Sequence, residues 1–259
     1  MELFQVKGKV CLVTGGGSGI GYGMALALVK HGAKVYICSR DMKKLQATAD
    51  ELTKRGPGSC YAIEADISKQ ENCKKVAEAI AAKETRLDVL VNNSGCVWGE
   101  ALETFPDSAW DKVIGLNVKA VFNMTVACLS LLRAKATVDD PSHVINIGSI
   151  DGIRVPVLET YSYSASKAAV HQLTRTLANR LATDYILVNA VACGPFHSKM
   201  TKSTFEQFRD TILDGVALGR FGDNDDLEGM TIFLSSRASK YVTGAIIPLE
   251  GGVLIKANL

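Results

Sequence analysis

Residues 9–21 read KVCLVTGGGSGIG, and this stretch decides the fold. Its first part, residues 9–14, is a short apolar and β-branched run that predicts a strand. Residues 20–31 have the apolar spacing of a helix. The glycines between them have no Cβ, so the backbone can turn tightly from the strand into the helix. A strand, a glycine turn and a helix in this order predict the first unit of a βαβ protein.

The alternation of strand and helix patterns continues to about residue 191. Strands separated by helices form parallel sheets that are covered on both faces. We therefore predict an α/β fold with a doubly wound, Rossmann-type parallel sheet and, since no linker or repeat interrupts the pattern, one domain over residues 1–259. Short β-rich runs predict further strands at 33–39, 59–65, 87–91, 143–147 and 186–191. Helical patterns predict helices at 42–55, from a capping-box sequence at 68–71 onward, at 116–133 and at about 161–182.

The composition excludes several classes of protein. The 29 Lys and Arg against 27 Asp and Glu give a net charge of +2 without any run of five like charges, so the sequence has no basic arm for nucleic acid. The longest charge-free apolar stretch, between Lys119 and Arg133, is shorter than the roughly 20 residues that cross a bilayer. Seven cysteines without a C-x-x-C pair and four histidines indicate neither a disulfide framework nor a metal site. We expect a cytoplasmic protein with a small-molecule partner and no nucleic acid, membrane or metal.

Three irregular segments, residues 92–107, 150–160 and 193–218, each follow a predicted strand. In an open parallel sheet, ligands bind in the crevice outside the carboxyl ends of the strands. We therefore expect these three segments to line the functional site.

The glycine turn has the form T-G-x-x-x-G-x-G between a strand and a helix. Free main-chain N–H groups and the positive end of the helix dipole meet the charge of a pyrophosphate at such a turn. A glycine turn that binds nothing is the alternative, but the βαβ context favours a dinucleotide. The residues predicted to bind it are Gly15, Gly17, Ser18, Gly19, Ile20 and Gly21.

The end of the second predicted strand selects between the nicotinamide dinucleotides. An acidic residue there would bind the adenosine ribose of NAD, but this chain has Ser39 and Arg40. A guanidinium at this position can pair with a 2′-phosphate, so NADP is the predicted cofactor. Alternatively, Arg40 is a solvated cation and Asp41 caps the next helix. After the third strand, Asp66 and Ile67 could bracket the adenine, although a purely structural role of Asp66 is an equal alternative.

Further motifs follow in a specific order along the chain. They are Asn92-Asn93-Ser94-Gly95, Ser149, Tyr163-Ser164-Ala165-Ser166-Lys167, and Tyr241-Val242-Thr243-Gly244 with Gly251-Gly252. Together with the glycine turn they resemble the short-chain dehydrogenase/reductase (SDR) family over essentially the whole chain. The segment INIGSI at 145–150 is most similar to bacterial and fungal members that act in secondary metabolism. The resemblance implies a homodimer or homotetramer, and it places Asn93 and Gly95 beside the cofactor ribose, where a plain turn is the alternative.

The reacting groups follow from the chemistry of carbonyl reduction. Hydride transfer needs an acid that protonates the developing alkoxide, and Tyr163 is the candidate donor. Lys167, four residues later on the same helix face, is expected to lower the Tyr163 pKa and to hold the nicotinamide ribose with its other donors. Ser149 would orient the substrate oxygen, and the resemblance adds Asn117, which would hold a proton-relay water. Such Tyr and Lys pairs also occur on surface helices, but the order of the motifs favours catalysis.

The segment after the sixth predicted strand departs from the family pattern. Cys193 stands before Gly194 where the family usually has proline, which leaves φ unfixed and restores an N–H. The resemblance implies that Phe196 and Ser198 hold the nicotinamide carboxamide, with Ser198 in place of a threonine. Cys193 itself has no identified base nearby, so we expect a small apolar filler rather than a nucleophile.

Three functions are compatible with these residues. The leading interpretation is an NADPH-dependent reductase of a carbonyl on a bulky, largely apolar substrate. An imine or iminium reductase, with coupled ring formation as in alkaloid-type biosynthesis, is the alternative. It is motivated by Cys193 and by Asp151, which either faces the pocket, where it would favour a cationic substrate, or is solvated or paired with Arg154. A third function is an NADP-sensing binding protein without turnover, which would need no proton donor. The apolar side chains that suggest the substrate are Trp98, Val155, Phe196, Met200 and Phe205.

Overall fold

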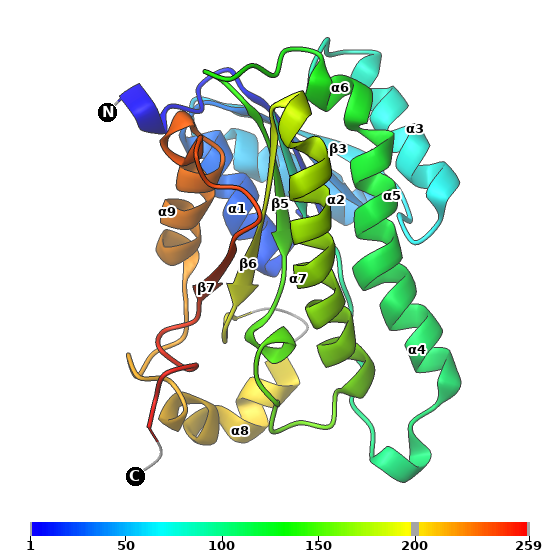
Figure 1. The fold of residues 1–259 in the computed structure, drawn as a ribbon, viewed down its shortest axis with the longest axis vertical. Helices are drawn as coiled ribbons and strands as arrows, with labels where there is room; N and C mark the ends of the chain where they lie inside the picture. Colours follow the sequence, from blue (N-terminus) through cyan, green and yellow to red (C-terminus); the bar gives the residue numbers. More distant parts are fainter. Residues whose placement is uncertain (1, 198–201, 258–259) are drawn as a thin grey trace.

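The architecture is a single twisted sheet between two layers of helices (Figure 1). A computed structural model describes residues 2–197 and 202–257. The sheet has the strand order β3-β2-β1-β4-β5-β6-β7, and all its neighbouring strands are parallel. The doubly wound, Rossmann-type prediction is therefore confirmed. The strands are β1 (Val10–Thr14), β2 (Lys34–Ser39), β3 (Ser59–Glu64), β4 (Val89–Asn92), β5 (Ser142–Ile147), β6 (Ile186–Cys193) and β7 (Ile246–Leu249).

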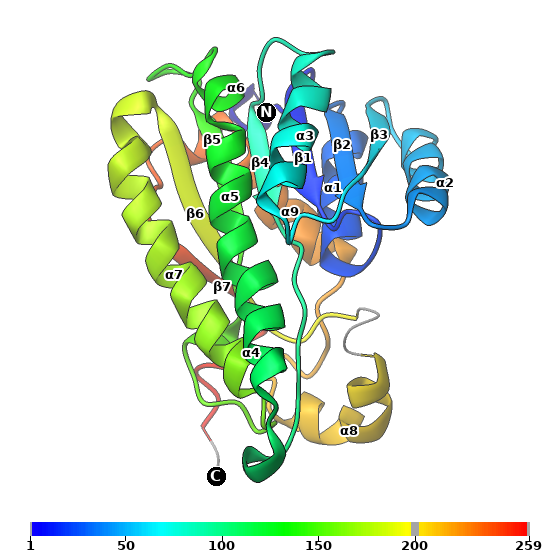
Figure 2. The ribbon, with the colours of Figure 1, turned by 90° about the vertical axis from the view of Figure 1, so that its right-hand side faces the viewer.

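Helices cover both faces of the sheet, and each face has its own apolar core (Figures 1 and 2). One face carries α1 (Gly19–Lys30), α2 (Met42–Thr53) and α9 (Asn224–Leu234). The other carries α3 (Gln70–Ala81), α4 (Asp107–Ile114), α5 (Ala120–Ala127), α6 (Leu129–Arg133) and α7 (Tyr161–Leu181), while α8 (Lys202–Asp214) lies beyond the carboxyl ends of the strands. The short helical turns are η1 (Glu2–Phe4), η2 (Leu102–Thr104), η3 (Gly115–Lys119), η4 (Ile150–Gly152), η5 (Ala182–Asp184) and η6 (Arg237–Ser239).

The helix α1 packs against α9, a helix near the carboxyl-terminal end of the chain. It is apolar on nearly all sides, and residues 23–29 are all buried. Its outer side is covered by α9, which approaches closely because Gly23 has no side chain: a Cβ there would lie 2.6 Å from Leu227 Cδ1. Segments about 200 residues apart in sequence thus complete one core.

Several elements differ from the sequence prediction. The strand β7 and the helices α4, α8 and α9 were not predicted, and α8 lies inside the segment 193–218, for which the prediction of irregular structure was wrong. Four residues that include Pro248 give β7 too short a pattern to recognise, and its place at the edge of the sheet tolerates the proline. The predicted helix at 116–133 is a π-helical turn, η3, followed by α5 and α6.

The predicted capping box at 68–71 is also wrong. The helix α3 begins at Gln70 with Lys69 as its N-cap, and no side chain caps it. The Ser68 N–H and hydroxyl instead both donate to Asp66 Oδ1, at 3.2 Å and 2.8 Å, so this serine belongs to the turn before the helix. By contrast, Asp41 does cap α2, since its side chain accepts a hydrogen bond from the Lys44 N–H.

The carboxyl ends of the central strands are joined by one side chain. The hydroxyl of Thr14, at the end of β1, donates to Val91 O at 3.3 Å. It also accepts hydrogen bonds from the main-chain N–H groups of Asn93 at 2.9 Å and Ser94 at 3.0 Å. The glycine turn after β1 and the segment after β4 are therefore held together at the edge where ligands bind in such sheets.

Among the described residues, no helix is long and apolar enough to cross a membrane.

We predict that His143 makes the stability of the fold sensitive to mild acid. This β5 residue is buried, neither ring nitrogen has a hydrogen-bond partner within the described protein, and burial together with the charge of Lys9 lowers its pKa to about 3. The unfolded chain takes up a proton near pH 6.5 whereas the folded chain does not, so the free energy of unfolding falls as pH drops from 6.5 to 3, by at most ~1.4 kcal/mol per pH unit.

Urea unfolding of the native chain and of His143→Leu at pH 7 and at pH 4.5 checks this prediction. We expect the variant to lose about 2 kcal/mol less than the native chain between the two pH values. An identical loss of unfolding free energy in both proteins would show that protonation of His143 does not destabilise the fold.

Candidate active site

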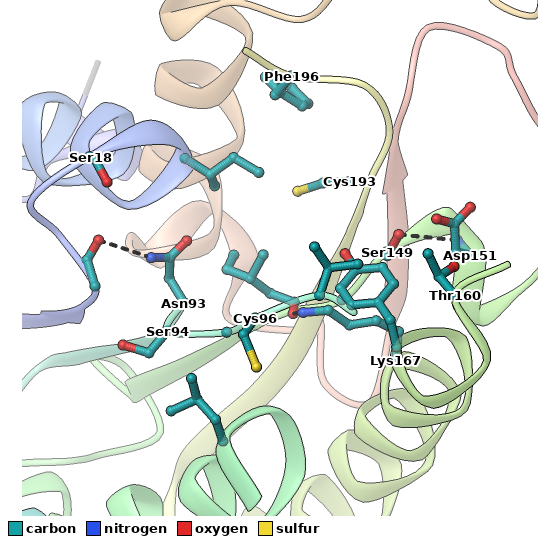
Figure 3. Close-up of a pocket in the computed structure, with 18 of the residues that line it drawn as sticks. Ser18, Asn93, Ser94, Cys96, Ser149, Asp151, Thr160, Lys167, Cys193 and Phe196 are labelled. Atoms are coloured by element: carbon teal, nitrogen blue, oxygen red, sulfur yellow. Dashed lines mark hydrogen bonds between the residues drawn. The ribbon is translucent and has the colours of Figure 1, made fainter. Parts of the chain in front are cut away.

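A cavity of about 1140 Å³ opens at the carboxyl ends of the strands (Figure 3). The glycine turn, the end of β2 and all three segments predicted to line the site contribute to its wall, so that prediction is confirmed. Figure 3 shows Ser18 at one end of this pocket and Ser149, Asp151 and Lys167 at the other, with Cys193 between them.

The glycine turn has the shape that a dinucleotide pyrophosphate requires. Gly15 has a φ of +67°, and a Cβ there would lie 2.8 Å from the amide nitrogen of Asn93. Ser18 is the N-cap of α1 but makes no capping hydrogen bond, which leaves the first N–H groups of the helix to a phosphate. Gly15, Gly17, Ser18 and Ile20 line the pocket.

Two of the predicted glycines shape the turn instead of lining the pocket. Gly19 has a positive φ of +57°, which a residue with a side chain rarely adopts. Gly21 packs against Asn93 and the main chain of Gly15 so closely that a Cβ would overlap both. They fix the path of the backbone that faces the ligand.

The end of β2 presents positive charge to the pocket. Ser39 and the exposed Arg40 line it, as does Lys44 from the first turn of α2. Asp41 caps α2 and forms an ion pair with Lys44 at 2.8 Å. Asp41 therefore caps the helix and Arg40 faces the pocket, while the pairing of Arg40 with a 2′-phosphate stays a prediction. Lys44 was missed in the sequence, where its spacing of four residues from Arg40 was the available signal.

Asp66 and Ile67 lie beside this positive end. Both line the pocket, and Asp66 also closes a turn by accepting from the Ser68 N–H at 3.2 Å and the Ser68 hydroxyl at 2.8 Å. The hydroxyl bond is the main cause that lowers the Asp66 pKa, and the charge of Arg40 adds to it. Asp66 thus has the structural role and also lines the pocket, and its contact with an adenine stays a prediction.

Ser149, Tyr163 and Lys167 meet at the other end of the pocket. Ser149 follows β5 and begins η4, with its Oγ accepting from the Asp151 N–H at 3.1 Å. On α7, the Lys167 Nζ lies 5.5 Å from the centroid of the Tyr163 ring and donates to Ile147 O at 2.7 Å. The Ser149 side chain lies close enough to Tyr163 to act on the pKa of its hydroxyl. The sequence prediction that these three residues come together is consistent with this geometry.

The protonation of the group differs from the sequence expectation. Burial raises the pKa of Tyr163 strongly, and the interaction with Ser149 opposes this rise. Burial also lowers the pKa of Lys167 to about 8. Desolvation of the phenol outweighs the interactions that would favour its ionised form. Tyr163 is therefore a protonated group at neutral pH, suited to give a proton.

Asn117 lies in the π-helical turn behind Lys167 and is fully buried. Its Oδ1 accepts from the Cys96 N–H at 2.9 Å, and its Nδ2 donates to Cys96 O and to Ser166 Oγ, both at 2.9 Å. Both amide hydrogens are used, so the side chain ties the segment after β4 to α7. That it holds a proton-relay water stays a prediction.

The segment after β4 supports the glycine turn. Asn93 donates to Thr14 O at 2.8 Å and to Gly15 O at 3.3 Å, while Gly95 lines the pocket and a Cβ there would meet Asn117 Oδ1 at 3.2 Å. Cys96, which the sequence did not single out, also lines the pocket, and burial raises its pKa.

Cys193 is the last residue of β6 and is in register with Leu249 of β7. The next residue, Gly194, donates its N–H to Leu249 O at 2.9 Å. The thiol is buried, and burial raises its pKa to about 12, so it is a neutral filler as expected. Phe196 is buried and lines the pocket, while Ser198 lies outside the described residues.

Asp151 both faces the pocket and pairs with Arg154, the two alternatives that the sequence left open. It lines the pocket, and its Oδ1 lies 3.6 Å from Arg154 Nε, with Arg154 also on the pocket wall. Burial raises its pKa and the Arg154 charge opposes that rise.

Of the apolar side chains expected near the substrate, Phe196 lines the pocket, Trp98 lies under the Lys112 ammonium and Val155 is exposed. Met200 and the side chain of Phe205 lie outside the described part of the chain.

Within the described residues, no cluster of three or more His, Cys, Asp or Glu side chains could hold a metal ion.

Comparison with known proteins identifies close relatives along the whole chain. A family model described as short chain dehydrogenase matches residues 9–209. The rhamnolipids biosynthesis 3-oxoacyl-[acyl-carrier-protein] reductase of Pseudomonas aeruginosa is 41% identical over 96% of this chain and 97% of its own. A 3-oxoacyl-[acyl-carrier-protein] reductase of Thermotoga maritima is 35% identical, over 97% and 100%. The 2-dehydro-3-deoxy-D-gluconate 5-dehydrogenase of Escherichia coli is 35% identical, over 99% of each chain.

Solved structures agree with these relatives. The Pseudomonas aeruginosa RhlG/NADP active-site complex superposes with a TM-score of 0.94 at 41% identity, covering 98% of this chain and 99% of that one. A gluconate 5-dehydrogenase of Burkholderia cenocepacia in complex with NADP and tartrate gives a TM-score of 0.91 at 27% identity, covering 99% of each.

Arg40 should set the preference between the two dinucleotides. We expect NADPH to bind more tightly than NADH by about 1.5 to 3 kcal/mol, the usual contribution of a charge-assisted hydrogen bond. Arg40→Asp should reverse this order, because a carboxylate repels the 2′-phosphate and accepts from the ribose hydroxyl. The exposed neighbour Lys43 does not line the pocket, so Lys43→Asp is the matched control. Fluorescence titration of the native chain and the two variants with both cofactors measures the six dissociation constants, and equal affinities in the native chain would make Arg40 a surface cation only.

Replacement of Tyr163 tests the proton donor. Tyr163→Phe should lower carbonyl turnover by about 10²- to 10⁴-fold, the range typical of general-acid loss, and leave NADPH affinity nearly unchanged. Tyr161→Phe is the control, since that exposed hydroxyl bonds only to Glu159 at 2.6 Å among the described contacts. Unaltered turnover in Tyr163→Phe would remove this phenol from the mechanism.

Proposed function

Because the chain belongs to the short-chain dehydrogenase family, we propose that it reduces the ketone of a bulky, largely apolar substrate with NADPH, and specifically the 3-oxo group of an acyl thioester. The protein is an NADP-dependent oxidoreductase. The observation that carries the proposal is the protonated Tyr163 hydroxyl, close to Ser149 and beside the buried Lys167, in a pocket continuous with the glycine turn.

The residues divide the chemistry between them. Bound NADPH supplies the hydride. The hydroxyl of Ser149 donates to the substrate oxygen and orients it, and Tyr163 gives its proton to the same oxygen as negative charge develops. Lys167 spends one donor on Ile147 O, which leaves its other donors for the nicotinamide ribose and its charge to stabilise the tyrosinate left after proton transfer.

An apolar wall supports an acyl substrate. Pro156, Val157 and Leu158 line the pocket from the segment after η4, and Phe208 and Ile212 line it from α8. Val157 is 86% exposed and Leu158 44%, which is a large apolar area for side chains at the mouth of a pocket. An alkyl chain would cover this area. The 41% identical relative carries the name of a 3-oxoacyl reductase of rhamnolipid biosynthesis, which supports both the substrate and a role in secondary metabolism.

Other substrates fit this wall less well. A sugar acid, as the name of the gluconate relatives suggests, needs a free cation for its carboxylate, and Arg154 is already paired with Asp151. The same ion pair gives Asp151 a cationic partner within the protein, which weakens the motive for an iminium substrate. A cofactor sensor has no use for the buried phenol.

The exposed apolar residues on α4 and α5 support association of this chain with itself. Trp110 is 39% exposed, Phe122 45% and Val126 42%. An isologous contact between such faces buries this area in a homodimer, and two contacts of this kind give a homotetramer.

Chain length tests the substrate class. We expect kcat/KM for 3-oxoacyl thioesters to rise several-fold per two added carbons, since a buried CH₂ contributes up to ~0.8 kcal/mol. Leu158→Asp should lower kcat/KM about tenfold for the long substrates and little for the shortest. Val155 is 90% exposed in the same loop and does not line the pocket, so Val155→Asp is the control. Faster reduction of sugar acids or cyclic imines than of any thioester would overturn the proposal.

A further inference from the structure

His171 lies directly beneath the turn that carries Ser149. It follows Lys167 by four residues on α7 and is 4% exposed. The main chain of Gly152 has a polar interaction with its ring that raises the His171 pKa, and its Nε2 has no hydrogen-bond partner within the described protein. No step of the proposed reaction uses this imidazole.

Two glycines leave the space that the ring fills. A Cβ at Gly148 would overlap His171 Nε2 and lie 2.8 Å from its Cδ2. A Cβ at Gly152 would lie 3.0 Å from His171 Cε1 and 2.7 Å from the Ala168 nitrogen. Gly148 and Gly152 bracket Ser149, so the ring contacts the turn on both sides of the hydroxyl-bearing residue.

The turn is anchored on its far side as well. The Gly148 N–H donates to Val191 O of β6 at 2.8 Å, and within the turn the Gly152 N–H donates to Ser149 O at 3.0 Å. The turn 148–152 therefore lies between β6 on one side and the His171 ring of α7 on the other. Because α7 also carries Tyr163 and Lys167, the size of the His171 side chain determines how far Ser149 lies from those two side chains.

We infer that His171 is a positioning residue, which sets the Ser149 hydroxyl against Tyr163 by holding the turn 148–152 on α7. The inference rests on the proposed function, in which both hydroxyls act on one substrate oxygen. Burying a polar imidazole costs free energy. Burial and the charges of Lys167 and Arg175 lower its pKa to about 4 and keep it neutral. An aliphatic side chain would fill the same space without this cost, but it would lose the polar interaction with Gly152.

Kinetics of two substitutions distinguish positioning from packing. His171→Leu keeps the bulk and removes the polar interaction with Gly152, so we expect kcat to fall about 10- to 100-fold while KM and the NADPH dissociation constant change less than about threefold. His171→Gln keeps a donor and should recover most of the lost kcat. His143→Leu is the matched control, since it removes another buried imidazole from β5 at the opposite end of the strand and should leave kcat unchanged.

A complementary exchange tests the fit of the ring against Gly148. Gly148→Ala should lower kcat, because the new methyl group pushes the ring or the turn away. In the double variant Gly148→Ala with His171→Ala, the space is restored, and kcat should exceed the product of the two single effects by about tenfold. Strictly multiplicative effects would show that the two positions act independently.

Hydrogen exchange measures the turn without any turnover. The Asp151 and Gly152 amides, which donate to Ser149 Oγ and Ser149 O, should exchange at least tenfold faster in His171→Leu than in the native chain or in His143→Leu. Unchanged exchange together with unchanged kcat overturns the inference. A native chain that reduces no ketone would contradict the proposed function, and the exchange rates would still decide the role of His171.

Discussion

A buried positive charge constrains the whole catalytic end of the molecule. Lys167 is 5% exposed, and an ammonium removed from water is stable only when its donors are satisfied. The bond to Ile147 O meets this need, and it can form only when α7 lies across the end of β5. That position brings Tyr163 to Ser149. Burial still lowers the pKa of Lys167 to about 8, so the hydrogen bond to Ile147 O only partly offsets the desolvation of the ammonium.

The cofactor end is held by neutral groups instead. Thr14 joins the ends of β1 and β4 through one hydroxyl, and the Asn93 amide holds the carbonyls of the glycine turn. Asn117 then links the segment after β4 to α7 through Cys96 and Ser166. The two ends of the pocket are therefore connected by hydrogen bonds between elements that lie on the central strands, where the sheet is most rigid. Hydride donor and proton donor can keep a fixed separation in such a frame.

The sequence was most informative where a chemical requirement repeats with a regular spacing. The glycine turn, the strands β1 to β6 and the meeting of Ser149 with Tyr163 and Lys167 follow from periodicity and motif order. The start of α3 was wrong because Ser68 forms a turn with Asp66 instead of capping the helix. The raised pKa of Tyr163 was not predicted, because burial depends on packing that no local pattern records. His171 was missed because the turn that it contacts lies on another element, whereas Lys44 and Arg154 pair with residues only three positions away.

The strand order has a consequence for the synthesis of the chain. Residues 10–64 can pair as β1, β2 and β3 while the rest is still being made, but β1 then presents an unpaired edge until β4 is complete at Asn92. The apolar outer side of α1 stays exposed for longer, because the helix that covers it, α9, is complete only when the chain reaches Leu234. A ribosome that adds 5 to 20 residues per second needs roughly 10 s or more to pass from Lys30 to Leu234. During that time the amino-terminal half exposes apolar surface and an unpaired strand edge. Folding in the cell therefore depends on preventing its association with other chains.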